Sequence, residues 1–181
     1  MQKTGIIRKV DDLGRIVIPK EIRKTIKIHE GDEMEIGVED GVKIVLKKYS
    51  PLDDVYETCS NYIKSLSDVM GITCMMIDLE KVLFVSGALS KKIENLLISE
   101  EFVKKLIKRE VTPKDNKIYK IFDESITGNK IMEEKVAPII IDGSVIGAIV
   151  LINNNSGRKF GTIEEKILEQ AISFFKLQME I

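Results

Sequence analysis

Residues 5–24 read GIIRKVDDLGRIVIPKEIRK, and this stretch decides the fold of the first part of the chain. Two short runs rich in β-branched residues, 6–10 and 15–18, lie on either side of the sequence DDLG at 11–14. β-Branched side chains fit the pleated surface of a sheet, and the composition of DDLG is typical of a turn. The pattern therefore predicts two strands joined by a turn.

The residues that follow predict a helix. Pro19 ends the second run, and proline is well tolerated in the first turn of a helix. Ile22 and Ile26 then lie one turn apart, on a single face. We therefore expect a helix that turns Arg23 and Lys24 away from its buried side.

Alternating residues predict a hairpin further along the chain. Apolar residues alternate with polar or small ones over 34–38 and again over 42–46, and Asp40-Gly41 lies between the two runs. The first fifty residues are thus predicted to form a ββαββ unit, which would bury too little surface to be comfortably stable alone. We expect two copies to associate and to place their basic surfaces symmetrically, as a duplex with pseudo-palindromic half-sites requires.

A second domain is predicted after Ser50-Pro51, because this dipeptide can end a strand and begin a helix. We place the two domains at residues 1–51 and 52–181. Within the second, residues 112–129 have no readable pattern. The other expected elements are helices at 55–70 with Gly71 as C-cap, 91–98 and 101–109, hairpins of 72–78 with 82–86 and of 136–141 with 145–152, and a last helix that has Thr162 as N-cap and Glu165 in a capping box.

Charge is unevenly distributed along the chain, although the formal net charge is only −1. Residues 1–27 hold eight basic and three acidic side chains, whereas residues 28–50 hold three basic and six acidic ones. Residues 51–181 hold 17 basic and 20 acidic side chains. The local excess of +5 at the start of the chain is either a solvated basic face or a surface for phosphates, where clustered Lys and Arg are rewarded by counterion release.

Several classes of protein are disfavoured. The longest apolar stretch, residues 145–152, is far shorter than the roughly 20 residues of a membrane span, and the first residues lack the apolar core of a secretory signal. We therefore expect a cytoplasmic protein with no membrane partner. With one histidine, and without a phosphate-binding loop, a nucleophile elbow or an H-E-x-x-H pair, the chain is expected to be no enzyme and to need no metal or cofactor.

Three further features have plain structural interpretations. Asp11 and Asp12 are expected to form a turn rather than to hold a cation, since no further oxygen ligands lie nearby. Cys59 and Cys74 fall at core-like positions and are expected to be inert buried thiols rather than redox sensors. His29 lies in a turn and is given no role.

Residues 5–24, with the hairpin and the sequence KKYSP at 47–51, resemble the AbrB family of bacterial swapped-hairpin transcription factors. The resemblance covers about residues 1–51, and the order of elements after it is similar to a GAF-like module. It implies an α+β protein, in which an intertwined swapped-hairpin β domain precedes a GAF-like α/β domain with flanking helices. It also implies a homodimer through the N-terminal domain and a homotetramer through the C-terminal domain.

The resemblance further implies a sequence-specific regulator that binds double-stranded DNA. Such a regulator would both activate and repress late sporulation genes, in the cytoplasm of the forespore. In this family the DNA-facing positions are basic residues of the first strand, the Leu-Gly-Arg turn and the helix, which match Arg8, Lys9, Arg15, Arg23 and Lys24 here. Relatives often have two consecutive arginines in the helix. Lys24 is a point charge instead of a planar fork, so we expect it to contact phosphate rather than read a base.

Two other functions are considered. Swapped-hairpin domains also occur in antitoxins, where a disordered toxin-binding tail usually follows them; here residues 52–181 have regular apolar periodicity and are expected to fold. A small effector bound by the GAF-like half is the third hypothesis, and no effector-binding residue can be named from the sequence.

Overall fold

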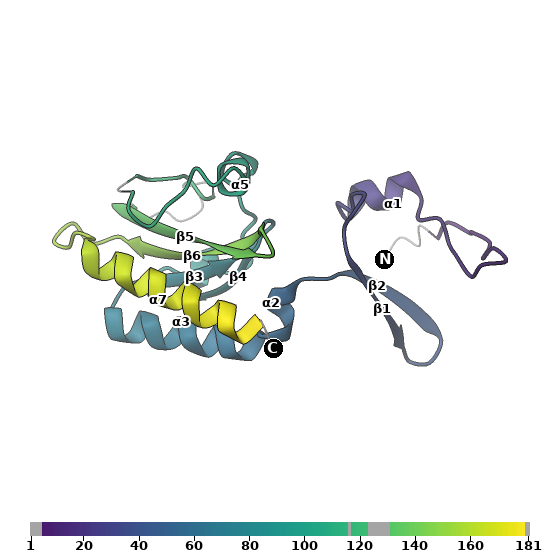
Figure 1. The fold of residues 1–181 in the computed structure, drawn as a ribbon, viewed down its shortest axis with the longest axis horizontal. Coiled ribbons are helices and arrows are strands. Elements are labelled where there is room, and N and C mark those ends of the chain that lie inside the picture. Colours follow the sequence, from purple (N-terminus) through teal and green to yellow (C-terminus); the bar gives the residue numbers. More distant parts are fainter. Residues whose placement is uncertain (1–4, 116, 123–130, 180–181) are drawn as a thin grey trace. The chain divides into compact units, whose positions relative to one another are not determined.

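The computed structural model describes residues 5–115, 117–122 and 131–179. The chain divides into two compact units, Met1–Tyr49 and Ser50–Ile181. Within the described residues, the first unit contains a two-stranded sheet and the second a four-stranded sheet, each accompanied by helices (Figure 1). This combination is an α+β architecture, as expected.

The first unit consists of a short helix and a hairpin. Helix α1, Lys20–Thr25, begins directly after Pro19, and strand β1, Met34–Glu39, pairs in antiparallel fashion with β2, Lys43–Lys48. The turn between the strands places Asp40 and Gly41 at φ 54° and 68°, which are the left-handed values that a type I′ turn requires. The predicted helix and hairpin are thus confirmed.

The prediction of two strands at residues 6–10 and 15–18 is wrong for the single chain, because residues 5–19 contain no strand. A turn does join the two runs, with the Asp11 N–H donating to the Arg15 carbonyl at 3.1 Å. A β-branched run becomes a strand only when another strand meets its backbone groups. Among the described residues, β1 and β2 pair only with each other, so the two runs meet no such strand.

The second unit is built on a sheet with the order β4-β3-β6-β5, in which every strand is antiparallel to its neighbours. Helices α3 and α7 lie side by side along one face of this sheet, and α5 lies over the other face (Figure 1). The strands are β3, Thr73–Ile77; β4, Val82–Ser86; β5, Glu133–Ile141; and β6, Ser144–Asn153. The helices are α2, Pro51–Asp54; α3, Tyr56–Met70; α4, Ser90–Ile93; α5, Glu100–Ile107; and α7, Thr162–Met179.

Each face of the sheet buries its own apolar cluster. The cluster on the side of α3 and α7 includes Cys59, Ile63, Leu168 and Phe175. The cluster on the side of α4 and α5 includes Ile93, Phe102, Leu106 and Ile121. The strands between the two layers are therefore buried on both faces, which explains the nearly continuous apolar sequence of β3 and β6.

Both predicted hairpins of the second half are confirmed, and Gly71 ends α3 at φ 64° as expected. The helix expected at 91–98 is shorter, because α4 ends at Ile93 and Asn95 adopts φ 62°. The residues after Asn95 extend the sheet edge instead, with the Val82 N–H donating to the Leu96 carbonyl at 2.9 Å. Part of the stretch without a readable pattern, residues 116 and 123–129, lies outside the described residues.

The last helix begins in a different way from the predicted capping box. Thr162 is already the first helical residue, and the Glu164 carboxylate accepts the Gly161 N–H at 2.8 Å. The cap is therefore Gly161, with Glu164 three residues later. A glycine in this place can cap a helix because its backbone adopts the required conformation without a side chain.

Candidate nucleic-acid interface

The five basic residues predicted to face DNA are all exposed. Arg8 and Lys9 lie in the segment before the turn, which has no regular secondary structure. Arg15 follows the turn, and Arg23 and Lys24 lie in the last turn of α1. Among the residues that the structure describes, only Arg15 of the five makes an ion pair. The charges of the other four are available to an external anion.

The turn at 11–15 is built around the Asp11 carboxylate. Its Oδ1 accepts the backbone N–H of Leu13 at 3.0 Å and that of Arg15 at 2.7 Å, while Gly14 adopts φ 76°. Its Oδ2 accepts the Arg15 Nε–H at 2.8 Å. The Arg15 N–H, followed by the guanidinium, lowers the pKa of the Asp11 carboxyl below its ordinary value. Asp11 thus forms the turn, as expected. Its contact with the Arg15 side chain was not predicted from the sequence, although the spacing of four residues between an aspartate and an arginine is visible there.

Helix α1 presents its basic residues at its C-terminal end. Arg23 and Lys24 lie in the last turn, where the negative end of the helix dipole favours cations. Ile22 is half-buried, but Ile26, expected on the buried side, is 48% exposed. The helix therefore has a basic side that faces solvent and an apolar side that the single chain covers only in part.

The hairpin has one apolar face, formed by Ile36, Val38, Ile44 and Leu46, which we call the hairpin face. In the single chain Ile36 is 71% exposed, Val38 73%, Ile44 68% and Leu46 41%. The opposite face is polar, and there Lys47 Nζ lies 3.6 Å from Glu35 Oε2. A contiguous exposed apolar surface of this kind marks a site of association.

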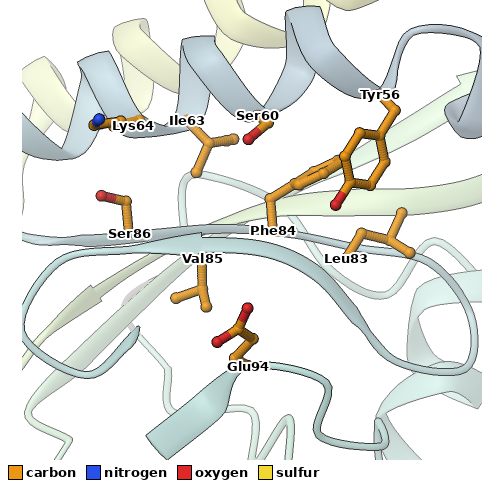
Figure 2. Close-up of a pocket in the computed structure, with 9 residues that line it drawn as sticks. All are labelled: Tyr56, Ser60, Ile63, Lys64, Leu83, Phe84, Val85, Ser86 and Glu94. Carbon is orange, nitrogen blue, oxygen red and sulfur yellow. The ribbon is translucent and has the colours of Figure 1, made fainter. Parts of the chain in front are cut away.

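The second unit has a pocket between α3 and β4, with a volume of about 190 Å³. Figure 2 shows Ser60 and Lys64 of α3 above the strand and Glu94, just after α4, below it. The pocket is smaller than the roughly 300 Å³ at which typical ligand sites begin. The full lining consists of Tyr56, Ser60, Ile63, Lys64, Leu83, Phe84, Val85, Ser86 and Glu94. No signal in the sequence brought these residues together, because they meet only through packing of α3 on the sheet edge.

Both cysteines lie in the core cluster under α3 and α7, where they are buried as expected. Burial raises the pKa of the Cys59 and Cys74 thiols to about 12. Because the thiolate is the reactive form, we expect a thiol reagent at neutral pH to label neither residue in the native protein and both after denaturation. Labelling can be followed by mass spectrometry. Rapid labelling of the folded chain would contradict inert thiols and would point to a redox role.

Comparison with known proteins supplies the family. Residues 54–180 match the family described as stage V sporulation protein T C-terminal, transcription factor. Stage V sporulation protein T of Bacillus subtilis is 36% identical over 184 aligned positions, which cover 99% of each chain. The chain belongs to the stage V sporulation protein T family. This family member is accordingly a DNA-binding transcriptional regulator of sporulation, and not an enzyme.

The N-terminal unit of this family member is AbrB-like. The transition state regulatory protein AbrB of Bacillus subtilis is 61% identical over 51 residues, which are 28% of this chain and 52% of that relative. Residues 7–54 also match the family described as antidote-toxin recognition MazE, bacterial antitoxin. The expected AbrB-like N-terminal unit is thus confirmed, and with it a capacity for DNA binding and oligomerisation.

The C-terminal unit has the expected GAF fold. The alignment with the GAF domain of PixJ from Thermosynechococcus elongatus covers 74% of this chain and 89% of the PixJ chain, with a TM-score of 0.57 and 15% sequence identity. At this identity the likeness concerns the fold alone.

Within the described residues, no helix is long and apolar enough to span a membrane, and no group of three metal-ligating side chains gathers.

Proposed function

We propose that this member of the stage V sporulation protein T family binds double-stranded DNA as an intertwined homodimer of residues 1–51, and that Arg8, Lys9, Arg15, Arg23 and Lys24 contact the duplex. The observation that carries the proposal is the pairing of exposed basic side chains with an uncovered apolar hairpin face in the same small unit. A second copy would cover the hairpin face and supply strands for residues 6–10 and 15–18. It would also double the number of cations directed at phosphate.

The five basic residues divide into two kinds of contact. Arg15 and Arg23 have planar guanidinium groups that can hold a guanine edge with two hydrogen bonds. These two residues would therefore fix the position of the protein along the major groove. Lys24 has a compact point charge and is assigned to phosphate, together with Arg8 and Lys9. Phosphate contacts then provide most of the affinity, and the arginines of the turn and helix provide the discrimination.

Residues 52–181 are proposed to associate with the same domain of another dimer, which would make the protein a homotetramer. Helices α3 and α7 carry large apolar side chains that the single chain leaves exposed, since Val69 is 83%, Ile163 70% and Leu177 62% exposed. A dimer of dimers would hold two DNA-binding units on one assembly. The regulator would then act in the cytoplasm of the forespore, as an activator at some late genes and a repressor at others, according to operator spacing.

The C-terminal domain is also assigned a small effector. The pocket between α3 and β4 combines the apolar Phe84 and Leu83 with the charged Lys64 and Glu94, which suits a compact polar molecule (Figure 2). A thermal-shift panel of nucleotides and metabolites tests this assignment. A stabilising compound that loses its effect in Lys64→Ala would support it, and a panel without any stabilising compound would leave the domain a purely structural dimeriser.

The whole proposal is tested by selecting duplexes from a random-sequence library with the full-length chain and by measuring its mass in solution. We expect a pseudo-palindromic consensus, because two symmetric units read two half-sites. We expect the mass of four chains. A library that returns no consensus, or a monomeric mass, would contradict sequence-specific binding by a dimer.

An antitoxin-like protein is the second candidate function, and the match of residues 7–54 to an antitoxin family favours it. Antitoxins of this kind usually neutralise their toxin with a disordered tail, whereas the described part of residues 50–181 has a four-stranded sheet between two helical layers. Limited proteolysis separates the two functions. Rapid digestion of the C-terminal half would favour the antitoxin, and a resistant half favours the regulator.

A further inference from the structure

The carboxylate of Asp11 lies between the basic residues Lys9 and Arg15 in the sequence, and its negative charge lowers the positive potential that attracts DNA. Asp11 precedes Arg15 by four residues and is joined to it by a 2.8 Å ion pair. Forming the turn requires only Oδ1, which accepts the N–H groups of Leu13 and Arg15. The second oxygen, Oδ2, makes a different contact, since it accepts the Arg15 Nε–H.

This contact leaves the outer part of the Arg15 guanidinium free. A guanidinium has five N–H donors in a fixed fork, and the one on Nε is occupied by Asp11. The four on the two terminal nitrogens have no partner among the described residues, and the side chain is 70% exposed. An exposed ion pair of this kind contributes little to folding stability. Its main physical effect is to restrict the rotamers of a long, flexible side chain.

We propose that Asp11 is a positioning residue, which holds the Arg15 guanidinium ready for a base edge and thereby increases sequence discrimination at the expense of general attraction to phosphate. The inference rests on the DNA-binding face proposed above. A side chain that is already ordered loses less conformational entropy on binding, and this gain applies only where its donors find matching acceptors. A matching base therefore benefits, whereas a mismatched one does not.

Asp11→Asn isolates the positioning contact from the turn. The asparagine retains an oxygen that can accept the Leu13 and Arg15 N–H groups, but its amide nitrogen cannot accept the Arg15 Nε–H. Asp12→Asn is the matched control, because it lies in the same turn and makes the same change of charge. The Asp12 side chain has no hydrogen bond or ion pair within the described residues. Thermal unfolding of both variants verifies that they fold like the unaltered chain.

The readout is the ratio of affinities for two probes, measured with the full-length variants. One probe is a duplex selected by the unaltered chain from a random-sequence library, and the other is a scrambled duplex of the same composition. Asp12→Asn is expected to tighten binding to both probes and to leave their ratio unchanged. Asp11→Asn is expected to tighten binding to the scrambled probe as much as Asp12→Asn does. It is also expected to lower the affinity for the selected duplex relative to that for the scrambled duplex by about threefold to tenfold. An unchanged ratio in Asp11→Asn would overturn the inference.

Arg15→Ala and the double variant Asp11→Asn/Arg15→Ala complete the cycle. If Asp11 acts through Arg15, Asp11→Asn has no further effect on the ratio once Arg15 is absent. If Asp11→Asn lowers the affinity ratio by a similar factor with and without Arg15, Asp11 merely maintains the turn. If Arg15→Ala itself leaves binding to the selected duplex unchanged, the proposed DNA-binding face is wrong, an outcome distinct from failure of the positioning role alone.

Discussion

Replacing Ile44 with lysine is expected to abolish N-terminal assembly and operator binding together. The hairpin face, to which Ile44 belongs, is exposed in the single chain and is covered by a second copy in the proposed dimer. Burial of one isoleucine side chain contributes about 1.5–3 kcal/mol, and a symmetric interface loses this contribution twice. The dissociation constant should therefore rise by about 10²- to 10⁴-fold, before the cost of burying two ammonium groups is added. Sedimentation should show a tetramer reduced to a dimer held by residues 52–181, and a retardation assay should show no operator complex.

Val45→Lys is the matched control for this prediction. Val45 is the next residue of β2, and its side chain lies on the opposite, polar face with the Lys47–Glu35 ion pair. In the single chain Val45 is 43% exposed and Ile44 is 68% exposed, so exposure alone would make Ile44→Lys the milder change. The proposed dimer predicts the opposite: Ile44→Lys should disrupt assembly and DNA binding more than Val45→Lys does. If Ile44→Lys assembles and binds as well as Val45→Lys, the hairpin face is not an interface.

Operator binding by the unaltered chain is expected to weaken by about 10⁴-fold between 50 and 200 mM salt, with a log–log slope near −7. This slope follows if Arg8, Arg15, Arg23 and Lys24 from two subunits each neutralise one phosphate, which makes about eight phosphates at about −0.9 each. The two base-reading arginines would do so with the N–H donors that the guanine leaves unused, and Lys9 is counted together with its neighbour Arg8. Arg23→Ala removes two of these contacts per dimer, so the slope should change to about −5. Titration of the selected duplex at several salt concentrations gives both slopes. Affinity at low salt should fall at least tenfold while the dimer remains folded.

Lys20→Ala provides the control for charge alone. Lys20 is the first residue of α1 and is exposed. We expect it to enlarge the positive field without touching phosphate. Its replacement removes the same charge as Arg23→Ala but should leave the slope near −7. Equal slopes for the two variants would mean that Arg23 is only part of a diffuse basic field. Binding that is insensitive to salt would contradict the whole interface.

Sequence reasoning succeeded where local chemistry decides the structure. The Asp40-Gly41 turn, the alternation in 34–38 and 42–46, and the glycine at the end of α3 each act within a few residues, and each was found in the expected place. Sequence reasoning failed where residues distant in the sequence offer hydrogen bonds to backbone groups that a helix would otherwise use. Residues 96–98 leave the expected helix because the edge of β4 offers them hydrogen bonds, and no short-range pattern reports that edge.

The candidate site divides in the same manner. The identity of the basic residues and the AbrB-like character of the N-terminal unit were evident from one stretch of twenty residues, because that motif is dense and specific. The contact between Asp11 and Arg15 was not, since spacing alone does not say which way a flexible arginine side chain turns. The pocket between α3 and β4 was equally invisible, because its residues come from three separate segments.

The amino-acid sequence by itself determined where the cations lie along the chain, which residues form the hairpin and which half carries the core, since these depend on composition, turn chemistry and periodicity. Only the tertiary structure decided that residues 5–19 form no strand in a single chain, that Asp11 restrains Arg15 and that the hairpin face stays uncovered. The physical reason is that strand formation, side-chain orientation and burial all depend on partners that are distant in sequence, and the sequence does not specify those partners until the chain is folded.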